Sequence, residues 1–193
     1  LCKNKKITLI EDVSNNLGIK ENNIKSGTLG DITICDFSLG KTITCGEGGA
    51  LLTNNKRVFD KAKEIRDGKN FENLCFRPTN LQAAMIFGQY KRLNDLVLNK
   101  KRILERYKKN FLNTGINIKG SNLIVIEIKK MNKSKINSLI NNLKKSNIYV
   151  EEATETKKYS KKNFIITPSN FDLKNEQIDY ISQKIKLFLK IKK

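Results

Sequence analysis

The sequence predicts an α/β protein with part of a mainly parallel sheet, flanking helices and a smaller α+β unit at the C-terminus. Three observations support this fold class. Short apolar segments alternate with helical patterns in the first half of the chain. A long amphipathic helical pattern follows, and two further strand patterns are each followed by a helix pattern. The 193 residues are enough for one large domain or two small ones.

Three short apolar segments in the first half have the composition of buried strands. They are residues 7–12 (ITLIED), 30–37 (GDITICDF) and 49–54 (GALLTN). The first ends in two carboxylates, as expected for a buried parallel strand whose C-terminal end carries polar groups. A helical pattern follows at residues 57–66. This alternation of strands and helices indicates an α/β sheet.

The clearest helical pattern begins at Thr79, which forms a predicted capping box with Gln82. We expect one long amphipathic helix, with a bend or break along its length, ending near Phe111. Its apolar residues recur at helical spacing: Leu81, Ala84, Met85, Gly88, Leu93, Leu96, Val97, Ile103, Tyr107 and Phe111.

The rest of the chain predicts a small α+β domain. The boundary is expected between Leu112 and Gly120, which gives domains 1–112 and 113–193. The closing helix carries one apolar face. The predicted elements are strands 122–128 and 163–168 and helices 133–147 and 175–190, and the face of the last helix is formed by Ile178, Ile181, Ile185 and Phe188.

The net charge of +19 raises the question of a nucleic-acid partner. A nucleic-acid-binding protein would gather its basic residues in a stripe or interleave them with aromatic residues. Here they are mostly Lys, scattered among many Asn and Ile, a composition typical of AT-rich coding sequence. We therefore expect no nucleic-acid partner, and the alternative would show a steep loss of binding with salt. No apolar run of about 18 residues is present, so no membrane partner is expected either.

The cysteine and histidine content narrows the chemistry. Cys2, Cys35, Cys45 and Cys75 form no CxxC pair, and the chain has no histidine. A zinc site of the usual Cys/His type is therefore not expected. Scattered single cysteines are typical of the reducing cytoplasm. Ser-His-Asp and Cys-His catalysis within this chain is excluded, which leaves Lys, Asp, Glu, Tyr or Cys for acid–base chemistry.

Lys41 stands apart in DFSLGKTITCGEGGALLTN, residues 36–54, among small, hydroxylic and apolar residues. Open α/β sheets bind ligands at the C-terminal ends of their strands, where both Asp12 and Lys41 are expected. A desolvated lysine is a nucleophile toward carbonyl carbons, and a carboxylate can pair with a protonated pyridine nitrogen. Lys41 and Asp12 are thus the minimum set for pyridoxal phosphate. The alternatives are a solvated lysine and an aspartate that serves a turn or a helix N-cap.

Three motifs, in order and at matching spacing, carry a resemblance to a known family. LIEDVSNNLG is similar to the pattern IEDAAQxxG, DFSLGKTITCGEGG to SFxxxKxITTGEGG, and CFRPTNLQAA to NYRMTNxQAA before a long helix. These patterns belong to the DegT/StrS-type sugar aminotransferases, fold-type-I pyridoxal-phosphate enzymes that act on nucleotide-linked keto sugars. The resemblance implies part of their large domain, followed by a small α+β C-terminal domain.

The resemblance also implies a role for each motif residue. Lys41 matches the lysine that binds the cofactor as a Schiff base and carries protons during the reaction. Asp12 matches the carboxylate that keeps the pyridine nitrogen protonated, and Asn15 stands near the ring, where the family usually has Gln. Asp36 replaces the phosphate-binding serine, and its carboxylate would repel a phosphate. Ser38 is the candidate substitute.

Two further residues correspond to a motif that reaches the neighbouring subunit. Cys75 stands where the family has Asn, and Arg77 is retained, so the resemblance implies a homodimer. It covers the second half of such an enzyme. The first half carries the helix N-terminus that cradles the phosphate and the aromatic residue that stacks on the ring. We therefore expect that the chain is truncated or that another polypeptide supplies the rest.

Taken together, the resemblance implies a cytoplasmic aminotransferase. It would transfer an amino group, with glutamate as the donor, to a nucleotide-linked keto-deoxy sugar for surface polysaccharide, lipopolysaccharide or a related glycan. The alternative is an inactive relative that binds a nucleotide sugar or serves as a scaffold. Asp36 and Cys75 favour that alternative, whereas Lys41 and Asp12 oppose it. A deoxygenating relative would carry histidine in place of Lys41 and is set aside.

Overall fold

The computed structural model describes residues 1–69, 75–120, 123–129, 131–153 and 162–191. The chain forms two compact units, Leu1–Val97 and Leu98–Lys193. The division falls within helix α3, Leu93–Asn110. The domain boundary expected after residue 112 stays a prediction.

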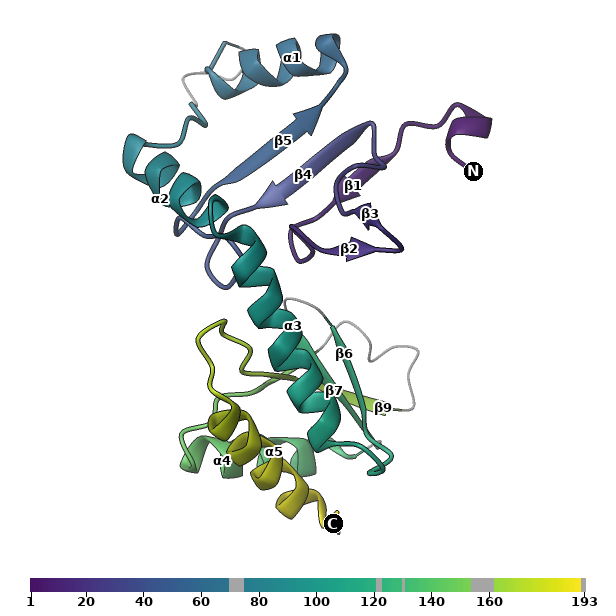
Figure 1. Ribbon diagram of the computed structural model, residues 1–193, viewed down its shortest axis with the longest axis vertical. Helices are drawn as coiled ribbons and strands as arrows, with labels where there is room; N and C mark the ends of the chain where they lie inside the picture. The colour runs from purple at the N-terminus through teal and green to yellow at the C-terminus, as the bar shows by residue number, and fades with distance from the viewer. Residues whose placement is uncertain (70–74, 121–122, 130, 154–161, 192–193) are drawn as a thin grey trace. The chain divides into compact units, whose positions relative to one another are not determined.

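Unit 1 contains a three-stranded sheet in the order β1 (Ile10–Asp12), β4 (Ile32–Asp36) and β5 (Gly49–Thr53) (Figure 1). Strands β1 and β4 are parallel. Strand β5 is antiparallel to β4, so the described part of the sheet is mixed. The reason lies in the connection 37–48, which forms turns and bends where a parallel pair would need a crossover, usually a helix.

The helices of unit 1 begin at side-chain caps. Helix α1 (Lys56–Arg66) starts after Asn55, whose side chain accepts hydrogen bonds from two backbone N–H groups of the first turn. Helix α2 (Asn80–Tyr90) starts at the capping box of Thr79 and Gln82, which confirms that prediction. The remaining elements are a short 3-10 helix, Lys3–Lys5, and a small hairpin of β2 (Lys20–Glu21) and β3 (Ile24–Lys25).

The long helical pattern is interrupted after Tyr90, and α3 begins at Leu93. The two helices differ in how their apolar residues are used. In α2, Leu81 and Met85 are 72% and 43% exposed. The buried part of the predicted stripe therefore belongs to α3, where Leu96, Ile103 and Tyr107 are buried, and to Phe111 directly after its end.

The core of unit 1 is small and lies directly under the strand ends. Val13, Cys35, Phe37, Ile43 and Cys45 form a buried cluster. Val13 follows the last residue of β1, and Cys35 and Phe37 flank the last residue of β4. The packing of this cluster therefore fixes the two strand ends at which functional side chains were expected.

Unit 2 is an antiparallel four-stranded sheet with helices packed against it (Figure 1). The predicted strand 122–128 corresponds to β7, and its first residue lies outside the described part of the chain. Strands β6 and β8 were not predicted. The strand order is β6 (Asn117–Gly120), β7 (Ile124–Lys129), β9 (Lys162–Thr167) and β8 (Glu151–Glu152), and the later helices are α4 (Lys133–Lys145) and α5 (Asn175–Leu189).

The core of unit 2 is the larger of the two. Helices α3, α4 and α5 contribute buried side chains that pack with those of β7 and β9. The predicted apolar face of α5 is confirmed, because Ile178, Ile181 and Ile185 are buried and Phe188 packs partly buried against the same cluster. Such a core, built from three helices and a sheet, supplies most of the apolar burial described in this chain.

Candidate active site

The ends of β1 and β4 place two carboxylates at the same edge of the sheet. Parallel pairing aligns Asp12 with Ile34, two residues before Asp36. The N–H of Val13 donates to the carbonyl oxygen of Ile34 at 3.0 Å and continues the pairing past Asp12. Asp12 and Asp36 therefore leave neighbouring strands at the carboxyl edge, where open α/β sheets bind ligands.

Lys41 reaches back to this edge. Its Nζ lies 3.3 Å from Oδ2 of Asp36 and donates to Oδ1 of Asn15 at 3.1 Å. The Lys41 side chain is 20% exposed and that of Asp36 is 37% exposed. The lysine thus bridges the segment after β1 and the end of β4, in a partly buried position.

Asp12 has a hydrogen-bond partner, Ser14, that was not among the site residues predicted from the sequence. The Ser14 hydroxyl donates to Oδ1 of Asp12, and the Ser14 N–H donates to the same oxygen at 2.9 Å. These hydrogen bonds, with a smaller contribution from Lys41, lower the pKa of Asp12 below its ordinary value. Asp12 is therefore ionised at neutral pH. The spacing Asp-x-Ser after a strand is the local signal, because it favours this type of turn.

Asp36 is held in the same way. Its Oδ1 accepts the Ser38 N–H at 2.7 Å. That bond, then the Ser38 hydroxyl and Lys41, lower the pKa of Asp36. Two ionised carboxylates therefore lie close to one lysine. The predicted contact of Ser38 with a phosphate stays a prediction, and in this structure the Ser38 N–H donates to the carboxylate of Asp36.

The loop that carries Lys41 is held by two glutamines of α2. The side chain of Gln89 donates to the carbonyl oxygen of Thr44 at 2.6 Å and accepts from the Thr44 N–H at 3.1 Å. Gln82 donates to the carbonyl oxygen of Glu47 at 2.9 Å. These hydrogen bonds pair backbone N–H and carbonyl groups of the loop, as a neighbouring strand would. They hold the loop after Lys41 against the helix.

Cys75 and Arg77 are placed differently from the group around Lys41. Arg77 donates from Nε to Oδ1 of Asp67 at 2.8 Å, and Arg66 does the same from the end of α1. Hydrogen bonds from Arg77 and Arg66 hold the pKa of Asp67 far below its ordinary value. Cys75 is exposed. The expected role of these residues at a partner's site stays a prediction.

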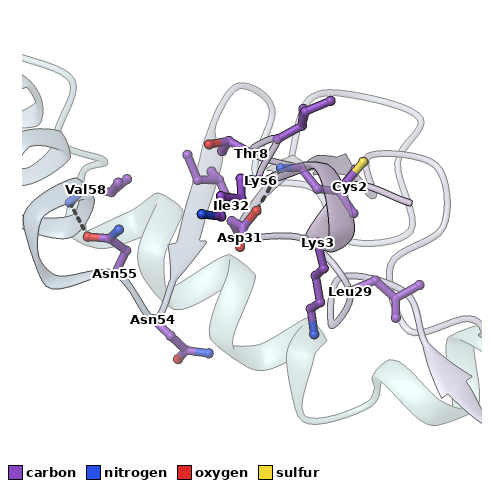
Figure 2. Close-up of a pocket in the computed structure, with 13 residues that line it drawn as sticks. Cys2, Lys3, Lys6, Thr8, Leu29, Asp31, Ile32, Asn54, Asn55 and Val58 are labelled. Atoms are coloured by element: carbon purple, nitrogen blue, oxygen red, sulfur yellow. Dashed lines mark hydrogen bonds between the residues drawn. The ribbon is translucent and has the colours of Figure 1, made fainter.

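A hollow of about 550 Å³ lies at the opposite end of the same strands, lined by the start of β4 and the residues after β5 (Figure 2). Two of its polar side chains accept hydrogen bonds from backbone N–H groups. Asp31 accepts the Leu9 N–H at 2.8 Å, and Asn55 caps α1. The carboxylate–lysine chemistry lies at the other strand end, so size alone does not identify the reactive site here.

The described part of the chain has neither a metal-binding cluster nor a membrane-spanning helix. No group of three or more His, Cys, Asp or Glu residues there could hold a metal ion. Among the same residues, no helix is long and apolar enough to cross a membrane.

A strand-end lysine with neighbouring carboxylates on an α/β fold is an arrangement typical of the pyridoxal-phosphate aminotransferase class. Residues 1–186 match the DegT/DnrJ/EryC1/StrS aminotransferase family, and the chain belongs to this family. The family resemblance seen in the three sequence motifs is thereby confirmed.

Curated relatives match a shorter segment. The GDP-perosamine synthase of Escherichia coli O157:H7 is 32% identical over 120 residues, and that of Vibrio cholerae is 33% identical over 117 residues. UDP-4-amino-4,6-dideoxy-N-acetyl-beta-L-altrosamine transaminase of Campylobacter jejuni is 31% identical over 122 residues. The matches cover 56% to 58% of this chain and 32% to 33% of each relative. The matched segment thus spans about a third of these proteins.

Solved structures share the fold over nearly the whole chain. PseC of Helicobacter pylori, an aminotransferase of pseudoaminic acid biosynthesis, has a TM-score of 0.82 at 20% identity, over 98% of this chain and 61% of its own. The Escherichia coli GDP-4-keto-6-deoxy-D-mannose-3-dehydratase, solved with bound hydrated PLP, has a TM-score of 0.82 at 17% identity, over 96% and 62%. These likenesses confirm the predicted fold class.

Proposed function

We propose that this chain is part of a pyridoxal-phosphate-dependent aminotransferase that acts on a nucleotide-linked keto-deoxy sugar. One arrangement carries the proposal: Lys41 Nζ lies 3.3 Å from Asp36 and 3.1 Å from Asn15, and Asp12 ends the neighbouring strand. The names of the relatives, synthases and transaminases of GDP- and UDP-linked sugars, support the substrate class.

The side chains of Lys41 and Asp12 fit the aldehyde and the ring of this cofactor. Lys41 provides a partly buried amine. Asp12 provides a carboxylate whose pKa is lowered, and an ionised carboxylate can pair with a protonated pyridine nitrogen. The carboxylate of Asp36 is a poorer match for the phosphate end, because like charges repel. Ser38 is the candidate contact there.

When bound, pyridoxal phosphate supplies an aldehyde that binds amines and a ring that takes up the electron pair left at the reacting carbon. Lys41 provides the amine for that aldehyde and, when free, can hold and return a proton at Nζ. Asp12 keeps the ring nitrogen protonated. Asn15 orients Nζ by accepting its hydrogen bond.

Four further parts of the proposal have other support. Glutamate as the amino donor and a homodimer with Cys75 and Arg77 at the partner's site follow from the family resemblance. A cytoplasmic location is favoured by the four cysteines, all of which are free. The product would enter a surface polysaccharide, a lipopolysaccharide or a related glycan.

The direct test is Lys41→Ala in the protein expressed from its native gene, supplied with pyridoxal phosphate, glutamate and a nucleotide-linked keto sugar. We expect amino transfer to be abolished, because no other amine holds this position, while the urea unfolding midpoint stays within error. The matched control is Lys56→Ala, which removes an 83% exposed lysine paired with Asp60. Turnover that survives in Lys41→Ala would contradict the proposal.

A second candidate is an inactive relative that binds a nucleotide sugar. The observation that favours it is the ion pair itself, because Asp36 already satisfies the charge of Lys41. The two candidates differ in cofactor binding. An inactive relative would bind the nucleotide sugar in calorimetry but show no absorbance band of bound pyridoxal phosphate.

A further inference from the structure

Lys41 lies beside two carboxylates at the C-terminal ends of β1 and β4 in unit 1. Asp36 approaches its Nζ to 3.3 Å, and Asp12 ends the adjacent strand. Nζ also donates a hydrogen bond to Asn15, whose side chain is a neutral amide. Two carboxylates against one ammonium group leave one net negative charge. Because the Asp36 side chain is 37% exposed, a ligand that reaches Lys41 meets this charge.

Asp36 also uses the donors that an incoming anion would need. It accepts the Ser38 N–H at 2.7 Å and pairs with the ammonium group of Lys41. A phosphate at this loop would compete with Asp36 for the same N–H and the same cation. It would also be repelled by the carboxylate, whereas an uncharged group would not.

We propose that Asp36 is a specificity-determining residue that makes Lys41 favour uncharged carbonyl compounds over phosphorylated ones. The inference rests on the proposed function of Lys41 as a carbonyl-binding amine. A dianionic phosphate about 6 Å from the carboxylate, in water-like surroundings, is disfavoured by about tenfold at low salt. Added salt screens this repulsion. A phosphorylated cofactor therefore needs compensating cations or N–H groups beyond those that Asp36 engages.

The reaction that reports this preference is simple. The neutral amine of Lys41 attacks the aldehyde carbon, a carbon–nitrogen double bond forms, and the carbonyl oxygen leaves as water with the two amine protons. Added borohydride then gives a hydride to the carbon, and the nitrogen takes a proton from water. The product is a stable secondary amine on Lys41.

Pyridoxal and pyridoxal 5′-phosphate are suitable probes, because they share the aldehyde and the ring and differ in the phosphate. The chain is treated with each at equal concentration and low salt, reduced, and analysed as peptides by mass spectrometry. The readout is the ratio of pyridoxal label to phosphate label at Lys41, divided by the same ratio at Lys56. Pyridoxal also closes into a hemiacetal, and this normalisation cancels that effect.

We expect Asp36→Asn to lower the normalised ratio about tenfold at low salt and less at high salt. Asp36→Ser should act in the same direction and provides a second variant with an uncharged side chain. The matched control is Arg57→Gln, which changes one exposed charge of α1 and leaves both the Asp36–Lys41 pair and the Lys56–Asp60 pair intact. Circular dichroism checks that each variant is folded.

Two results would overturn the inference. A ratio that is the same in the unaltered chain, Asp36→Asn and Asp36→Ser would remove the role of Asp36 and leave Lys41 as a carbonyl-binding amine. Absence of label at Lys41 with both aldehydes, while Lys56 is labelled, would overturn the proposed function of Lys41 as well.

Discussion

Asp12 shows how a single neighbour can lower the pKa of a candidate site residue. Both hydrogen bonds that Ser14 donates end on the same carboxylate oxygen. These hydrogen bonds lower the pKa of Asp12, and the group is ionised over the neutral range. A carboxylate in this state suits the task of pairing with a protonated ring nitrogen.

We predict that Asp12→Asn in the native-gene protein keeps cofactor binding but lowers kcat on the order of a hundredfold, because the amide has the same shape without the charge. Absorbance titration measures binding and steady-state assays measure kcat. Ser14→Ala is the graded control, since it removes a hydrogen bond and leaves the carboxylate. An unchanged kcat in Asp12→Asn would show that Asp12 is structural.

Lys41 and Asp12 could be proposed as site residues from the sequence because each has a local signal, an isolated lysine and a strand that ends in carboxylates. Gln89 has no such signal. It binds the backbone of Thr44, 45 residues away in sequence, and ordinary helical composition does not reveal that contact. The partner of Arg77 was likewise not predicted, because Asp67 lies ten residues earlier in the sequence and no local pattern links the two. Contacts of this kind depend on the fold.

At the scale of elements, the predictions succeeded where local chemistry decides and failed where pairing decides. The capping box of Thr79 and the apolar face of α5 are local patterns, and both are confirmed. The direction of β5 depends on how its connection to β4 runs. Strand β6 has the sequence NIKG, which carries one apolar residue, and it is a strand because β7 pairs with it.

Helices α3 and α5 are joined by a charged pair whose effect on stability depends on pH. Arg106 on α3 forms a two-bond ion pair with Asp179 on α5, and Asn110 adds a third hydrogen bond. The Arg106 hydrogen bonds lower the pKa of Asp179 from 3.8 to about 2. A lowered folded-state pKa means that the stabilisation is present above pH 4 and is lost as the pH falls toward 2.

We therefore predict that Asp179→Asn makes the free energy of unfolding less dependent on pH between about 2 and 4. The difference at neutral pH should be below about 1 kcal/mol, because the Asp179 side chain is 40% exposed and solvent screens the pair. Urea unfolding across this pH range measures it. Glu105→Gln is the control, because Glu105 is an exposed acid on α3 that pairs with Lys108. Equal slopes for the unaltered chain and Asp179→Asn would contradict the prediction.

At the scale of the whole molecule, the two units differ in how much apolar surface they bury. The cluster of unit 2 draws on three helices and the sheet. The cluster of unit 1 is small, and apolar side chains of its sheet remain exposed: Ile10 at 59%, Ile34 at 37% and Leu51 at 44%. Register pairs Ile34 with Leu51, so these two share one face. Unit 1, which carries the candidate site, therefore has the smaller buried core, and we expect it to open more readily than unit 2.

This difference predicts a pattern of amide hydrogen exchange. Amides of β7 and β9 should exchange more slowly than those of β1 and β4, because their opening exposes the larger core. Bound pyridoxal phosphate should then slow exchange in β1, β4 and the loop after Lys41 and leave β7 and β9 unchanged, since a ligand stabilises the part that binds it. Mass spectrometry with and without the cofactor measures both, and Lys41→Ala is the control. Slowing in β7 and β9 alone would place the cofactor outside the strand-end site, whereas slowing confined to unit 1 and absent from Lys41→Ala would tie it to Lys41.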